Sequence, residues 1–191
     1  MKKRTKILLP ALLLAVAVTL CGCVRTVDEL YRVPRRSVGY RNLQAVMEQQ
    51  MQNLSFCAPG SGENQQAVQM ADLDGDGMEE VILFAKANDD RPLKILVFSF
   101  MDGDYSLMGK IERAGAAFNQ VEYVQMDGKP GLEIVVCTEL SDQLPRNISV
   151  HTFSGGTTKE LLSTECRQFL CCDLNGNSVS DLLVLKCVVY G

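Results

Sequence analysis

A short acidic segment recurs three times in this chain, and the recurrence constrains the fold more than any other feature of the sequence. The strongest copy runs from Asp72 to Glu80 and carries carboxylates at its first, third, fifth and ninth positions. A weaker copy occupies residues 173–181, and the weakest occupies residues 125–133. The ninth residues of the three copies, Glu80, Glu133 and Asp181, are 53 and 48 residues apart. Independent hairpins would have no reason to keep this spacing, so the sequence predicts a chain of repeated units.

Each unit contains short apolar runs that are typical of β-strands. The first unit has four such runs, with the turn signal Asp102-Gly103-Asp104 between the last two. The second unit repeats this order, and the third contains two runs. The expected strands are residues 67–71, 81–84, 93–100, 105–111, 118–126, 132–138, 148–153, 159–166, a run from Phe169, and 182–190. Four antiparallel strands in about 50 residues is the size of a β-propeller blade. The predicted fold is therefore all-β, with propeller-like blades at about residues 65–113 and 114–166 and an incomplete one at 167–191.

One short amphipathic helix is expected ahead of the strands, at residues 41–54. Its apolar residues recur at helical spacing on one stripe, with Gln and Glu opposite. They are Leu43, Val46, Met47, Met51 and Leu54. We expect this stripe to pack on the sheet that follows; the alternative is a helix that docks a partner. Residues 58–66, rich in Pro and Gly, are expected to form a loop, so that helix and loop together occupy 41–64.

The N-terminus has the features of an export signal. Four basic residues precede an apolar run at 7–20, which is too short to span a bilayer comfortably. The run ends at Leu20-Cys21-Gly22-Cys23, which resembles a bacterial lipobox, and the resemblance implies that Cys23 receives the lipid. We therefore expect residues 1–22 to be removed and the protein to be anchored on the extracytoplasmic face of a bacterial cell membrane. The alternative is an ordinary secretory signal. Residues 23–40 are interpreted as a tether.

Charge and cysteine content restrict the possible partners and cofactors. Removing residues 1–22 leaves 15 of the 19 basic residues against 23 acidic ones, a surface that repels nucleic acid. Six cysteines follow the signal region, without a C-x-x-C pair, and the chain has a single histidine, so a zinc site is not expected. Most of these cysteines lie in apolar strand runs and are interpreted as small buried hydrophobes, although export would also permit disulfides.

The first acidic segment carries the ligands that a hard cation prefers, because Ca²⁺ takes six to eight oxygen ligands. An EF-hand is excluded, since its twelfth position requires a bidentate Glu and this chain has Leu83 there. The unit from Ala71 to Leu83 instead resembles an FG-GAP or VCBS repeat, the calcium-binding β-hairpin of integrin-α-like propellers. The resemblance implies a structural Ca²⁺. Its ligands would be the Met78 backbone carbonyl and four side chains, those of Asp72, Asp74, Asp76 and Glu80. The alternative is an Asp/Gly-rich turn without metal.

The other two acidic segments have lost ligands. The third segment is expected to bind Ca²⁺ more weakly or not at all, because two of its four candidate side chains are neutral amides. The four are Asp173, Asn175, Asn177 and Asp181. The second has Gln125 and Lys129 at its first and fifth positions. The Lys129 ammonium is expected to neutralise Asp127 and Glu133 in place of an ion.

The sequence favours binding over catalysis. His151 lies in a strand pattern, and the chain has no nucleophile elbow and no phosphate-binding glycine loop. We expect a binding or scaffold module that is not an enzyme, and the resemblance implies a protein or carbohydrate ligand. The alternatives are an accessory or sensor domain of a cell-envelope system, or a non-catalytic part of a larger carbohydrate-active enzyme. Closed propellers have four to eight blades. About two and a half blades therefore imply a part of a longer protein, an open stack, or completion by partners.

The lipid anchor is directly testable. Mass spectrometry of the protein from bacterial membrane fractions should find a mature N-terminus at Cys23 with a diacylglyceryl adduct, because only Cys23 has a small residue before it. An unmodified N-terminus at another residue would contradict the assignment.

Overall fold

A computed structural model describes residues 38–140 and 145–186, which belong to one compact unit. The signal region, Cys23, the tether up to residue 37 and Cys187 lie outside the described residues. Within the described part, no helix is both long enough and apolar enough to cross a membrane.

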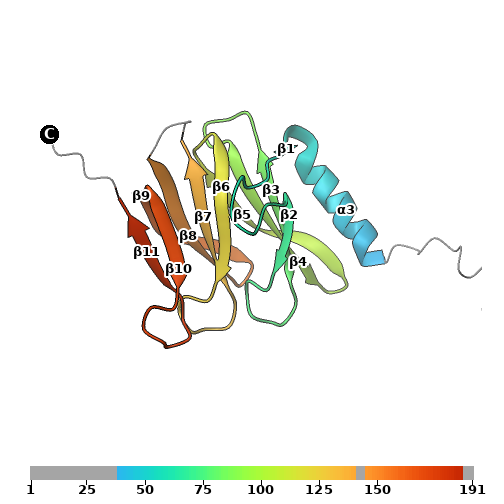
Figure 1. Cartoon of the computed structure of the whole chain (residues 1–191). Helices are drawn as coiled ribbons and strands as arrows, with labels where there is room; N and C mark the ends of the chain where they lie inside the picture. The colour runs from blue at the N-terminus through green and yellow to red at the C-terminus, as the bar shows by residue number, and fades with distance from the viewer. Residues whose placement is uncertain (1–37, 141–144, 187–191) are drawn as a thin grey trace, which may run out of the picture. The chain divides into compact units, whose positions relative to one another are not determined.

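The strands form three antiparallel sheets that follow one another along the chain (Figure 1). Sheet A is five-stranded and comprises β1 (Ser55–Phe56), β2 (Val68–Ala71), β3 (Glu80–Lys86), β4 (Leu93–Met101) and β5 (Asp104–Arg113). Sheet B is four-stranded and comprises β6 (Ala117–Val124), β7 (Glu133–Glu139), β8 (Arg146–Ser154) and β9 (Thr157–Cys166). Sheet C comprises β10 (Gln168–Cys172) and β11 (Asp181–Leu185). In A and B the strands after the acidic segment pair in sequence order.

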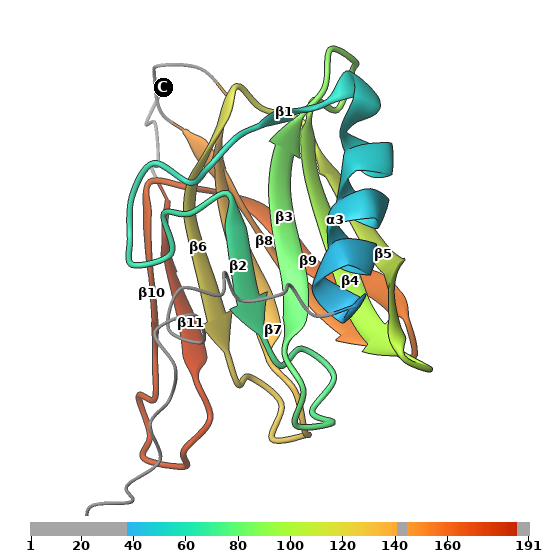
Figure 2. The same cartoon turned by 90° about the vertical axis from the view of Figure 1, so that its right-hand side faces the viewer.

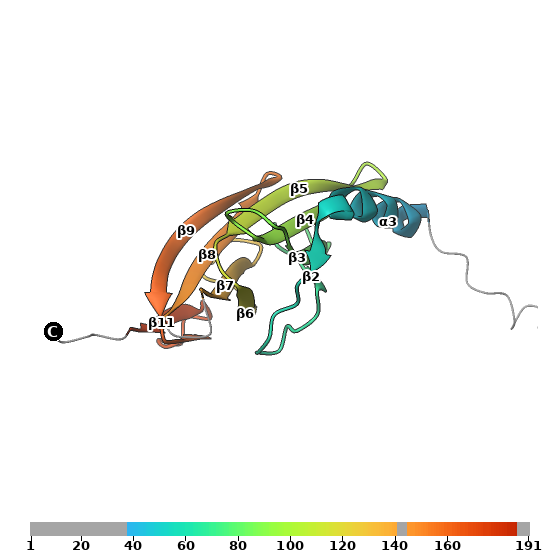
Figure 3. The same cartoon turned by 90° about the horizontal axis from the view of Figure 1, so that it is seen from above.

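The sheets pack face to face behind a helix, and three apolar clusters separate the layers (Figures 1 and 2). The helix α3 (Val38–Gln50) continues into the 3₁₀ turn η1 (Met51–Asn53) and packs on sheet A. The largest cluster lies between sheets A and B, where Phe84 meets Phe118 edge to face at 5.2 Å. A smaller cluster lies between sheets B and C. The layer order is therefore helix, A, B and C, and the view along the strands shows the same succession (Figure 3).

Alternation along each strand decides which layer a side chain reaches. In β3, Val81 packs toward the helix and Ile82 packs toward sheet B. In β7, Ile134 packs toward sheet A and Val135 packs toward sheet C. Both central strands read as continuous apolar runs because each of them is covered on both faces.

The structure confirms a mostly β chain with antiparallel pairing and with strands at the expected positions, and it adds the short strand β1. The expected strand at 182–190 is present as β11 up to Leu185, and residues 187–190 of it lie outside the described part. The helix is also present, but it begins three residues before the predicted start at residue 41. Its apolar stripe packs on the sheet, as expected. All five cysteines in the described part are free, and only Cys137 and Cys166 are fully buried. Burial raises the pKa of the Cys137 thiol to about 12.

Candidate metal centre

The first acidic loop brings three carboxylates together. Asp72 and Asp74 lie in the turn after β2, and Glu80 is the first residue of β3. One carboxylate oxygen from each lies within 4.8 Å of the others. Two ligands of one Ca²⁺ are at most about 5 Å apart, since Ca–O distances are about 2.3–2.6 Å. The three side chains therefore fit a shared cation.

Backbone amides hold these carboxylates in place. Asp72 accepts hydrogen bonds from the amides of Gly75 at 2.7 Å and Gly77 at 3.0 Å, through its two oxygens. Glu80 accepts from the Leu73 amide at 2.9 Å and from the Ser99 hydroxyl at 3.2 Å. Each carboxylate oxygen can accept more than one bond, so these oxygens keep lone pairs for a metal. The cluster is thus oriented by the fold before any ion binds.

Glu80 is the member whose charge is hardest to maintain without a cation. Its residue is only 2% exposed. Burial raises the pKa of the Glu80 carboxyl, and the nearby charges of Asp74 and Asp76 raise it further, against the Leu73 and Ser99 hydrogen bonds. A divalent cation would relieve both the desolvation and the repulsion.

The other two predicted ligands, Asp76 and Met78, are not part of the three-carboxylate cluster. Asp76 is exposed and stands outside the three-carboxylate cluster, and its Oδ1 accepts a 2.7 Å bond from the Met78 amide. The Met78 side chain is also exposed, as expected if only its carbonyl were to serve. Sequence reasoning missed Ser99, which lies on β4 opposite the loop, because no local motif links it to Glu80.

All three acidic loops share one hydrogen-bond pattern, which confirms their equivalence. The ninth-position carboxylate accepts from the second-position amide in each loop, with donors Leu73, Met126 and Leu174. The side chain at the first position accepts from the fourth-position glycine amide in each, at 2.7 Å. The loops therefore fold alike although their side chains differ.

The second loop supplies its own cationic and donor groups. Lys129 Nζ lies 2.5 Å from Asp127 Oδ2, so the predicted pairing with Asp127 is present, and it lowers the pKa of Asp127. The ion pairs of the described residues do not include one between Lys129 and Glu133. The side-chain amide of Gln125 donates to the carbonyls of Lys129 and Gly131. Gly131 holds the position at which the first loop has Met78.

In the third loop, backbone amides surround Asp173, and those of Ser178, Gly176, Asn177 and Asn175 lower its pKa in that order. Asn175 and Asn177 accept from the amides two residues ahead. Asp181 accepts from Leu174 at 3.2 Å. The predicted ligands therefore surround one turn, with only two carboxylates among them.

Neighbouring loops are joined by a repeated backbone hydrogen bond that sequence reasoning did not foresee. The Leu132 amide of the second loop donates to the Asp72 carbonyl of the first at 3.1 Å. The Ser180 amide of the third loop donates to the Gln125 carbonyl of the second at 2.7 Å. In both cases the eighth position of one loop binds the first position of the loop before it. Figure 1 shows the three loops side by side at one end of the sheets.

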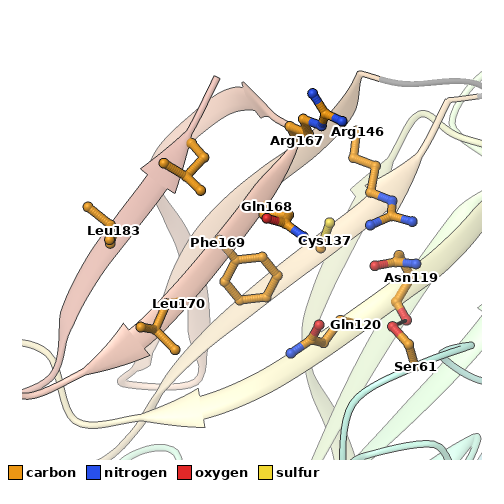
Figure 4. A pocket seen from close by; sticks show the side chains of 11 residues that line it. Ser61, Asn119, Gln120, Cys137, Arg146, Arg167, Gln168, Phe169, Leu170 and Leu183 are labelled. Carbon is orange, nitrogen blue, oxygen red and sulfur yellow. Dashed lines mark hydrogen bonds between the residues drawn. The ribbon is translucent and has the colours of Figure 1, made fainter. Parts of the chain in front are cut away.

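A cavity of about 590 Å³ lies at the opposite end of sheets B and C (Figure 4). Its only charged lining residues are Arg146 and Arg167, and Arg146 pairs with Glu139 at 3.4 Å. The rest of the lining is uncharged and mixes polar with apolar side chains: Ser61, Asn119, Gln120, Cys137, Gln168, Phe169, Leu170, Leu183 and Leu185. Such a surface can hold a small polar or anionic ligand.

His151, the single histidine, belongs neither to the acidic loops nor to the lining of this cavity. It is buried on β8, where its Nε2 lies 2.9 Å from the Ser149 hydroxyl. Burial, reinforced by the charge of Arg113, lowers the pKa of His151 to about 4. The ring is therefore neutral at physiological pH and packed within the sheet.

Compared with known proteins, the chain matches no protein-family model, no curated protein and no solved structure.

Two glycines with the same backbone conformation test the contact between the loops. Gly75 and Gly176 are equivalent, and both have φ of +78°. A Cβ at Gly75 would overlap the Pro130 ring and lie 2.5 Å from the Gly131 nitrogen, whereas one at Gly176 would meet nothing within 4 Å. We expect Gly176→Ala to cost about 1 kcal/mol of unfolding free energy from left-handed strain alone. Gly75→Ala should cost about 1–3 kcal/mol more, because it also overpacks the contact.

Chemical denaturation of the two variants provides the comparison, with Gly176→Ala as the matched control. Equal losses of stability would show that the first and second loops are not in contact.

Proposed function

We propose that this chain is a lipid-anchored, extracytoplasmic binding or scaffold module whose first acidic loop holds a structural Ca²⁺. The observation that carries the proposal is the cluster of Asp72, Asp74 and Glu80, whose carboxylate oxygens lie within 4.8 Å of one another. Bound Ca²⁺ would supply positive charge to these groups and to the Met78 carbonyl. The loop's amides orient the carboxylates, and Ser99 fixes the buried one.

The position of the cluster supports a structural role for the ion. Asp72 contributes its carboxylate to the cluster and its carbonyl to the bond from Leu132. An ion that fixes Asp72 would therefore also stabilise the junction between the first two units. The carboxylates of the cluster are bonded to backbone amides of the loop and to Ser99 of β4, so holding the hairpin is the role we assign to the ion.

The sheets are proposed to be propeller-like blades of the FG-GAP or VCBS kind. Support comes from the repeated loop pattern, from the sequential antiparallel order of β6 to β9, and from the face-to-face packing of successive sheets. The predicted lipid at Cys23 would place these sheets outside the cytoplasm. The cavity beside Phe169 offers one place for a ligand, and a protein or a carbohydrate is the class we propose. The alternative roles are an accessory or sensor domain of a cell-envelope system and a non-catalytic part of a larger carbohydrate-active enzyme, and both would need the same binding surfaces.

Calcium should raise the melting temperature of the full-length protein. With about 1 mM Ca²⁺ and a dissociation constant near 10⁻⁴ M, binding contributes about 1.4 kcal/mol. For a chain of this size that corresponds to roughly 3–6 °C. Asp74→Ala should abolish the shift, because it removes one of the three clustered carboxylates.

Differential scanning calorimetry with and without a chelator measures the shift. Asp127→Ala is the matched control, since it alters the third position of a loop that carries its own ammonium group. A folded protein with no calcium-dependent shift, or a shift that Asp74→Ala leaves intact, would overturn the structural-ion role.

A further inference from the structure

The cavity between sheets B and C lies where a loop that covers strand β6 has no counterpart beside strand β10. The loop at 58–66 crosses from sheet A to β6, and there the amides of Gly60 and Ser61 donate to carbonyls of that strand. Only residues 114–116 connect β5 to β6, which is too short a segment to cross to β10 in the same way. Among the described strands β10 pairs with β11 alone, and the space beside it is the cavity.

Among the described residues, two arginines carry all of the charge that lines the cavity. Strand register places them together, because Arg146 pairs with Cys166 across β8 and β9 and Arg167 is the next residue along the chain. Arg146 Nη2 lies 3.4 Å from Glu139 Oε1, an oxygen that also accepts a 2.7 Å bond from the Asn119 amide. Arg167 is exposed and takes part in none of the ion pairs of the described residues.

This wall is therefore positive in a chain whose acidic residues outnumber its basic ones. A guanidinium group binds a carboxylate or a phosphate through two parallel N–H···O bonds. Glu139 already shares one of its oxygens between two donors, so it neutralises Arg146 only in part. A neutral ligand would leave the charge of Arg167 uncompensated, and an anionic ligand would offset it.

The uncharged part of the lining suits the ring of a sugar. Figure 4 shows Phe169 between Leu170 on one side and Arg146 on the other. The Phe169 ring offers an apolar face to the C–H groups of a sugar ring. Gln120 and Gln168 bring amide donors and acceptors that match hydroxyl groups. The volume of about 590 Å³ falls within the range of about 300–1,000 Å³ that is typical of small-molecule sites, and it exceeds what a lone inorganic anion fills.

We propose that this cavity binds a uronic acid, a sugar whose ring carries a carboxylate. The carboxylate would lie at Arg146 and Arg167, and the ring would pack on Phe169 with its hydroxyls toward the amide side chains. The proposal deepens the binding role proposed above and rests on it, because it names the charge and the chemical class of the carbohydrate.

Isothermal titration calorimetry on the full-length protein tests this site. The protein is kept in micelles of a detergent without sugar head groups, at one fixed Ca²⁺ concentration. The probes are D-glucuronate and D-galacturonate, and their methyl esters are the matched controls, since they keep the ring and lose the charge. We expect at least one of the acids to bind at a single site and its ester to bind roughly tenfold more weakly, because a charge-assisted hydrogen bond contributes on that order to affinity.

Receptor variants decide whether the cavity is responsible. Arg167→Gln should weaken binding of the acid roughly tenfold and leave binding of the ester unchanged. Arg91→Gln is the matched control, because Arg91 is an exposed arginine that does not line this cavity. Phe169→Leu should weaken the acid and the ester alike, since it removes the aromatic face and no charge.

Four results would overturn the proposal. They are the absence of binding by both acids, an ester that binds as tightly as its acid, equal binding of the acid by the Arg167→Gln and Arg91→Gln variants, and inorganic phosphate that binds as tightly as the acids. The last result would make the cavity an anion site without preference for a sugar. Arg167 is exposed, so Arg167→Gln should keep the melting temperature of the unmodified protein and its loss of binding can be attributed to the site.

These results can be separated from a failure of the proposed function. An ester that binds as tightly as its acid would keep a carbohydrate as the ligand and remove only the requirement for charge. The calcium-dependent shift in melting temperature, measured on Arg167→Gln, tests the structural ion by itself, since the cavity lies at the end of the sheets opposite the acidic loops.

Discussion

The backbone hydrogen bond that joins consecutive acidic loops is the interaction on which the order of the sheets depends. It links the eighth residue of one loop to the first residue of the loop before, and it occurs at both junctions in the described structure. Because both partners are backbone atoms, the bond survives wide variation in the loop side chains. It fixes where each hairpin begins relative to its neighbour. Alternation along β3, β7 and β11 then decides which side chains enter which interface.

This arrangement explains how the three loops keep one shape although their charges differ. The loop shape comes from side-chain acceptors that bind backbone amides, and these bonds are common to all three copies. The charges of the loops, unlike their shape, differ from copy to copy. The first loop gathers the carboxylates of Asp72, Asp74 and buried Glu80, whose mutual repulsion a bound cation would offset. In the second loop, the Lys129 ammonium pairs with Asp127 and the Gln125 side-chain amide donates to the Gly131 carbonyl.

The sequence predicts the features that are local or periodic. The helix stripe, the strands and the three-loop equivalence could all be inferred, because alternation and spacing carry them. The Lys129 pair followed from residue chemistry at a known loop position. The sequence did not indicate that Ser99 supports Glu80, or that Pro130 packs over Gly75, because these contacts depend on how separate hairpins meet. Asp76 lies outside the cluster of three carboxylates and accepts a bond from the Met78 amide, so its place among the ligands stays a prediction.

Amide hydrogen exchange at the two loop junctions tests this account most directly. Exchange measured by NMR on the full-length protein in detergent micelles would report the protection of the Leu132 and Ser180 amides individually. If the junctions organise the stack, both amides should exchange about as slowly as those in the centre of β7, since opening them would require separating adjacent sheets. Rapid exchange at Leu132 and Ser180, at the rate of the exposed loop amides of Asp127 or Asn175, would contradict the account.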